Sequence, residues 1–201
     1  MAAAPALTPG LLRELEDCWR DQDLPLVQRL QPGLSHEQID ALTAPLGLRL
    51  PTEALLWWTW RDGAVAEDLA IERELGPGFE FLPLAQAVEQ CVFQRKLAAE
   101  FGESPADAEF WWHTSWFPIT HRGGAVACDC SVAKGAPTPI FSPFSHDLDV
   151  DGRTHPAALS FGQMVRWWIE AFEEGIWRYD AIARSWDYRR ENRPPARERL
   201  V

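Results

Sequence analysis

The sequence predicts an α+β fold, and three observations favour it. Apolar residues recur at helical spacing in the first half of the chain and again near its end. Between these segments lies a region rich in aromatic and β-branched residues, and the pair Gly123-Gly124 within it is typical of a hairpin turn. The chain has 201 residues, of which 46% are hydrophobic, and this is enough for one well-packed domain.

The first two predicted helices cover residues 11–19 and 35–47. Leucines and a tryptophan in the first segment fall on one side of a helix. In the second segment, Ser35 and Gln38 have the spacing of a capping box. In this motif the side chain of each residue accepts a hydrogen bond from the backbone N–H of the other. Gly47 then ends the helix, because glycine readily adopts the left-handed conformation of a helix C-terminus.

Two further helices are predicted over residues 52–61 and 84–101. Pro51 opens the first of them, which is apolar nearly all round, so we expect it to be enclosed by the rest of the protein. The second carries two apolar stripes on opposite sides, and Phe93 and Phe101 belong to the outer one. Either this helix is covered on both sides, or one stripe faces a partner.

The second half of the chain is predicted to form a loop, three strands and a last helix, over residues 102–109, 111–119, 125–131, 138–144 and 160–174. Prolines place the third of these strands at a sheet edge, because proline cannot donate a hydrogen bond to a neighbouring strand. Trp167 falls on the polar face of the last helix, beside Glu170 and Glu174. Beyond Tyr188 the chain turns polar and is predicted to be a tail.

The charge is strongly negative and unevenly distributed. The formal net charge is −11, yet residues 184–199 hold six arginines and three acidic residues, so the remainder carries −14. Such a body repels nucleic-acid phosphates and favours a basic protein partner, although solubility alone would also explain it. We therefore expect no nucleic-acid binding. The sequence contains no apolar run long enough to span a membrane and no secretory-type start, and its four cysteines do not form a disulfide framework, so we expect a cytoplasmic protein without membrane contact.

The sequence offers weak candidates for chemistry. His121, Cys128 and Cys130 could contribute to a metal-dependent enzyme site, but their spacing matches no zinc motif. Residues Asp147, Asp149 and Asp151 begin like a calcium-binding loop. The bidentate glutamate required at the twelfth position is replaced by Ala158, so we interpret this segment as an acidic loop. No phosphate-binding or nucleophile motif is present, and we expect neither a catalytic residue nor a cofactor or metal.

The order of five segments resembles that of one protein family. A helix of the type Ser-x-x-Gln-Ile precedes LGLRLPTEALLWWTWRDGA, and FLPLAQAVEQ, WFPITHRGGAVACDC and LSFGQMVRWWIEAFEEG follow in turn. This succession, over residues 35–175, resembles the SUKH superfamily of Smi/Knr-type cell-wall-assembly regulators and bacterial immunity proteins. The resemblance implies a central, mostly antiparallel β-sheet with helices packed against it, and a role in binding without catalysis. Thr120 and His121 stand where the family often has a glycine.

These observations predict a domain over residues 35–178, preceded by a helical extension over 1–34 that packs on it. A helical end and arginine-rich tail follow over 179–201. The leading hypothesis is a bacterial immunity protein, a monomer or weak dimer, that neutralises a basic toxin domain, such as a nuclease, by direct binding. A regulatory scaffold of the Smi/Knr type and the metal-dependent enzyme are the alternatives. The residues predicted to contact a partner are Trp60, Asp62, Asp147, Asp149, Asp151, Trp167, Glu170 and Glu174.

Overall fold

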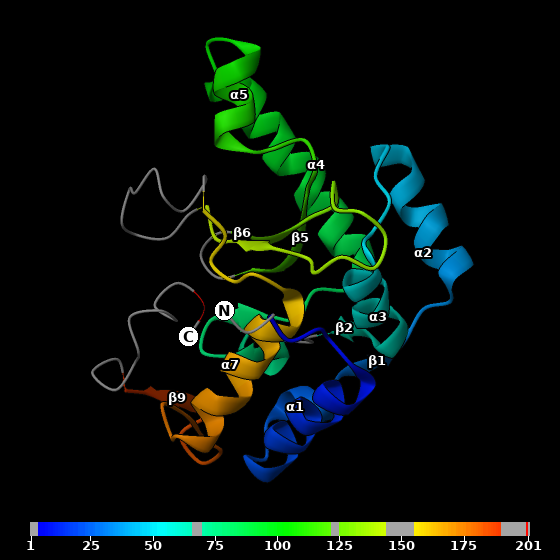
Figure 1. Ribbon diagram of the computed structural model, residues 1–201. Helices are drawn as coiled ribbons and strands as arrows, with labels where there is room; N and C mark the ends of the chain where they lie inside the picture. Colours follow the sequence, from blue (N-terminus) through cyan, green and yellow to red (C-terminus); the bar gives the residue numbers. More distant parts are fainter. Residues whose placement is uncertain (1–3, 66–69, 122–124, 144–154, 190–199, 201) are drawn as a thin grey trace.

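The computed structural model describes residues 4–65, 70–121, 125–143, 155–189 and 200, and it has an α+β fold (Figure 1). The described ranges contain six α-helices: α1 (Pro9–Asp21), α2 (His36–Thr43), α3 (Thr52–Trp60), α4 (Leu84–Phe101), α5 (Pro105–Trp111) and α7 (Phe161–Glu173). Short 3₁₀ turns cover Pro25–Gln28, Ala44–Leu46 and Ala70–Arg73. Within these ranges, no helix combines the length and the apolar composition needed to cross a membrane.

The main sheet is antiparallel, and its strands follow one another in chain order: β3 (Glu74–Gly76), β4 (Phe79–Glu80), β5 (Trp116–His121), β6 (Ala125–Asp129) and β7 (Ile140–Phe141). Two small antiparallel pairs complete the described strands, β1 (Leu30–Pro32) with β2 (Arg61–Ala64), and β8 (Trp177–Asp180) with β9 (Ser185–Tyr188). The hairpin predicted around Gly123-Gly124 is thus confirmed by the pairing of β5 with β6. β7 lies at the sheet edge, as the prolines predict.

Both faces of the β5–β6 hairpin are covered. Phe117 and its cross-strand partner Cys128 belong to the main core, whereas Trp116 and Ala127 belong to a second apolar cluster that also includes Trp112. Figure 1 shows α4 alongside this hairpin, with α5 packed against it at one end of the molecule and α1 and α7 at the other. α1, which lies within the predicted extension over residues 1–34, contacts α7, and its apolar stripe enters the main core.

Tryptophan side chains fill the main core. Trp57 on α3 is fully buried, and its ring centroid lies 4.6 Å from that of Phe81, 5.1 Å from that of Phe161 and 6.3 Å from that of Trp168. Trp58 is also fully buried, so the predicted enclosure of this helix is confirmed. Large rings in mutual contact remove much apolar area from water. Core packing therefore explains several of the eleven tryptophans, and these need no role in binding a partner protein.

Two predicted features are wrong. Residues 102–109 are not a loop, because α5 begins at Pro105, and Ser104 caps it by accepting a hydrogen bond from the Asp107 N–H (3.2 Å). The end of the chain is not helical over its described part, because β8 and β9 form a hairpin. Its turn is stabilised by Asp180, whose carboxylate accepts hydrogen bonds from the N–H groups of Ile182 and Ala183 (2.9 and 2.8 Å).

Candidate functional site

Trp60 and Asp62, two of the predicted contact residues, have structural partners. The half-buried Trp60 ring stacks on Trp19 (5.7 Å between centroids) and on Phe81 (6.0 Å). The carboxylate of Asp62 accepts a hydrogen bond from the Leu84 N–H at 2.7 Å. That N–H opens α4, whose preceding proline offers no capping side chain, so Asp62 stabilises the start of this helix.

Replacing Asp62 by asparagine is expected to remove one pH-dependent contribution to stability. Burial raises the pKa of this carboxyl above its usual 3.8, although the Leu84 N–H opposes the shift. An acid with a raised pKa in the folded state destabilises that state as the pH rises from its unfolded pKa through its folded one. Asparagine stays neutral and still accepts the Leu84 bond. Urea unfolding between pH 3 and 7, about the range in which such a group titrates, measures the free energy of unfolding of both proteins. The value for Asp62→Asn minus that for wild type should increase with pH. A difference that is the same at every pH would contradict the argument.

Trp167, Glu170 and Glu174 lie on one face of the last helix and at its end. Trp167 is half-buried and packs against the main core, Glu170 is half-buried, and Glu174 is exposed at the C-cap. They share α7, whereas Trp60 and Asp62 lie on α3 and β2. Asp147, Asp149 and Asp151 lie outside the described residues. Ala158, at the twelfth position of the predicted acidic loop, is buried in a β-bridge with Ile140.

The histidine and thiols considered for metal-dependent chemistry do not form a cluster of ligands. Among the described residues, no group of three or more His, Cys, Asp or Glu side chains could hold a metal ion. Burial raises the pKa of the Cys128 thiol well above its usual value, and hydrogen bonding with Cys130 adds to the effect. Burial likewise raises the pKa of Cys91 to about 11. Both thiols are therefore protonated near neutral pH and are weak nucleophiles.

Exposed apolar side chains gather instead on the hairpin formed by α4 and α5. Eight large apolar residues of the described chain are exposed, and five of them lie on these two helices: Val92, Phe93, Phe101, Phe110 and Trp111. We call these five residues the α4–α5 surface. Phe101, 65% exposed, lies with its ring centroid 6.2 Å from that of Trp111. Phe93 and Phe101 of the outer stripe of α4 are therefore not covered by the described part of the chain.

Acidic residues accompany the α4–α5 surface. Residues 96–111 contain one lysine and four acidic residues, so their net charge is −3. Lys96 pairs with Glu100 (3.8 Å) and Glu109 pairs with the His113 ring (3.1 Å). Glu103 and Asp107 are exposed near the junction of the two helices. The surface thus combines aromatic rings with negative charge, a combination that suits a partner with an apolar patch and basic neighbours.

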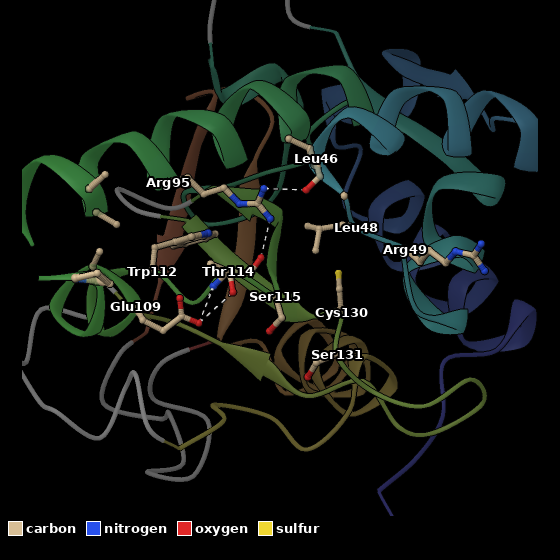
Figure 2. Close-up of a pocket in the computed structure, with 15 residues that line it drawn as sticks. Leu46, Leu48, Arg49, Arg95, Glu109, Trp112, Thr114, Ser115, Cys130 and Ser131 are labelled. Carbon is tan, nitrogen blue, oxygen red and sulfur yellow. Dashed lines mark hydrogen bonds between the residues drawn. The ribbon is translucent and has the colours of Figure 1, made fainter.

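A groove of about 820 Å³ lies on the inner side of the same two helices (Figure 2). It is lined by Leu46, Gly47, Leu48, Arg49, Arg95, Ala98, Ala99, Pro105, Ala108, Glu109, Trp112, Thr114, Ser115, Cys130 and Ser131. The Arg95 guanidinium donates to the carbonyl oxygens of Leu46 (3.0 Å) and Thr114 (2.6 Å) and so joins α4 to both walls. The segments that meet here are far apart in the sequence, and no motif or spacing indicates the groove.

Two residues of the groove lining, Ser115 and Glu109, belong to a network of hydrogen bonds and ion contacts with His113 and Asp129. The Ser115 hydroxyl lies 2.7 Å from Nδ1 of His113 and donates to Oδ1 of Asp129 at 2.8 Å, while Glu109 contacts Nε2 of His113. Burial alone would raise the pKa of Asp129, but hydrogen bonds from Ser131 and Ser115 and the nearby His113 outweigh it and lower that pKa. The single hydroxyl hydrogen of Ser115 is donated to Asp129, so it is not donated to His113. These hydrogen bonds therefore connect α5 to β6.

Comparison with models of known protein families and with curated proteins gives no match for this chain.

Proposed function

We propose that this protein is a protein-binding module, an immunity protein that neutralises a basic toxin domain by direct binding. The observation that carries the proposal is the α4–α5 surface. An exposed group of aromatic and aliphatic side chains on a folded protein is typical of a site that another protein covers. The resemblance of residues 35–175 to the SUKH superfamily supports the same class of function.

The α4–α5 surface supplies the side chains that an interface needs. Aromatic residues such as Phe101 and Trp111 bury large areas at a low cost in conformational entropy, and residues of this kind dominate measured binding energies. Phe93 and Val92 extend the surface along α4. Their removal from water on complex formation would provide most of the affinity.

The charge of the chain supplies the preference for a basic partner. A net charge of −11 attracts a positively charged domain over distances of about 10 Å at moderate ionic strength, which speeds encounter. The local net charge of −3 over residues 96–111 then favours basic side chains next to the aromatic group. Complex formation should therefore be fast at low salt and slower at high salt.

Co-expression with the product of the adjacent gene tests this function. We expect that product to arrest growth when it is expressed alone and to be neutralised when this protein is present. The purified pair should form a complex whose association rate constant falls about tenfold or more between 20 mM and 500 mM salt. If growth is not rescued and no complex forms at low salt, the proposed function is wrong for this partner.

A further inference from the structure

We infer that the groove binds an acidic side chain of the partner, held in a short segment with apolar neighbours. The inference rests on the proposed function, because the groove and the α4–α5 surface share the same two helices. α5 ends with Trp111 on the surface, and the next residue, Trp112, lines the groove. α4 contributes Phe101 to the surface and Arg95 to the groove. A partner that covers the α4–α5 surface is thus placed to insert a segment beside it.

The first argument is charge. Arg49 and Arg95 both line the groove, and neither has a carboxylate within salt-bridge distance in the described part of the chain. Of the eleven arginines in the described ranges, seven form salt bridges, and Arg49 and Arg95 are the two of the other four that line the groove. Salt bridges are formed by Arg20, Arg29, Arg61, Arg73, Arg166, Arg184 and Arg189. Glu109 is the one carboxylate among the described residues of the lining, and it is engaged by Thr114 and His113. The two arginines therefore leave the lining with a net positive charge, while the chain as a whole is negative.

The second argument is hydrogen bonding. Trp112 is 2% exposed, and its indole N–H has no acceptor among the described residues, nor does the Nε–H of Arg95. Both side chains line the groove (Figure 2). Two N–H donors without acceptors in one lining favour a ligand with acceptor oxygens, and a carboxylate is the strongest such acceptor in proteins. Both nitrogens are closed to solvent in this structure, so a bound carboxylate would have to displace the groups that cover them.

The third argument is the apolar part of the lining. The apolar lining includes Leu46 and Leu48, between α2 and α3, and Ala98, Pro105 and Ala108 from α4 and α5. These side chains offer no hydrogen bonds and would cover aliphatic neighbours of the bound acid. Long-range electrostatic attraction alone would favour any basic protein. The groove adds specificity, because a partner with only basic side chains at the interface has no acidic residue for the groove to bind.

Three capped peptides test the inference: acetyl-Leu-Glu-Leu-amide and its matched forms with Gln or Lys at the centre. Each is titrated into ¹⁵N-labelled protein, and the indole N–H signal of Trp112, assigned with Trp112→Phe, is followed. We expect the Glu peptide to shift this signal saturably, with a Kd about fivefold lower than that of the Gln peptide. The Lys peptide should give no saturable shift.

Arg49→Gln is the clean variant, because Arg49 is exposed, whereas Arg95→Gln would also remove the bonds to Leu46 and Thr114. Arg49→Gln should weaken binding of the Glu peptide about threefold and leave binding of the Gln peptide unchanged, and Arg13→Gln on α1 is the matched control without effect. Equal affinity for all three peptides, or no saturable shift with any of them, overturns the inference. The titration contains no partner, so its failure leaves the co-expression result standing, and failed co-expression leaves a charge-selective groove standing.

Discussion

Glu53→Gln is expected to reduce the free energy of unfolding by about 3 kcal/mol. Glu53 is 5% exposed, and its carboxylate accepts three backbone N–H groups, from Leu7 (2.6 Å), Thr138 (2.6 Å) and Gly162 (3.1 Å). A glutamine side chain has one oxygen, so its NH₂ group would face a backbone N–H. That donor would be buried without an acceptor, and the remaining bonds would lose the assistance of the negative charge.

The effect should extend beyond the side chain itself, because Glu53 holds together segments that are far apart in sequence. It connects α3 to the chain before α1, to the strand region at Thr138 and to the start of α7. Urea unfolding followed by tryptophan fluorescence measures the change. Glu89→Gln, an exposed substitution of the same kind on α4, is the control and should fall within about 0.5 kcal/mol of wild type. Equal effects of the two substitutions would show that Glu53 does not join these segments.

Trp57→Ala is expected to cost about 4 kcal/mol, since it removes a fully buried ring that contacts Phe81, Phe161 and Trp168. Replacement by phenylalanine separates packing from hydrogen bonding. The Trp57 indole N–H has no partner among the described residues, whereas that of Trp168 donates to the Leu200 carbonyl at 2.8 Å. Trp168→Phe should therefore cost about 1 kcal/mol more than Trp57→Phe.

Thermal or urea unfolding of these two phenylalanine variants provides the comparison. The ring is replaced in the same way at two fully buried positions, so most of the packing loss is common to both. An equal cost, or a larger cost for Trp57→Phe, would mean that the bond from Trp168 to residue 200 does not stabilise the fold.

The elements that the sequence predicts well have strong local signals. Ser35 and Gln38 do form the capping box, and the helix predicted over residues 160–174 is observed as Phe161–Glu173 with Ser160 as its N-cap. The helix predicted over residues 84–101 has the same bounds in the structure. In each case, the stop or start residue and the apolar spacing lie within a few residues of one another, so tertiary contacts add little to the assignment.

The missed elements depend on contacts that a local pattern does not contain. Trp111 and Trp112 favour a strand by propensity, but the Ser104 cap and packing against α4 place Trp111 in a helix. The β8–β9 hairpin is stabilised by cross-strand aromatic packing of Tyr179 on Trp186, whose ring centroids are 5.4 Å apart. In both places, contacts outside the local segment decide the conformation of a few residues with ambiguous preference.

The candidate site divides in the same way. The outer stripe of α4 is visible in the sequence because Phe93 and Phe101 are spaced along one helix, and only the structure shows that these two side chains are exposed. The groove is different, because Arg49, Arg95 and Trp112 come from separate segments that no spacing relates. Asp62 and Trp60 were predicted from charge and aromaticity alone, which do not distinguish a contact residue from one with a structural partner.

The central claim, that the α4–α5 surface binds a protein partner, is tested most directly by the Kd of one double variant. Phe101→Ser with Trp111→Ser removes the two rings that meet on this surface, and Ile182→Ser removes a side chain that is 98% exposed on the β8–β9 turn. We predict that the double variant binds the adjacent-gene product about 100-fold more weakly at low salt, a loss of about 3 kcal/mol, and that Ile182→Ser binds like wild type. Unchanged affinity of a folded double variant would contradict the account.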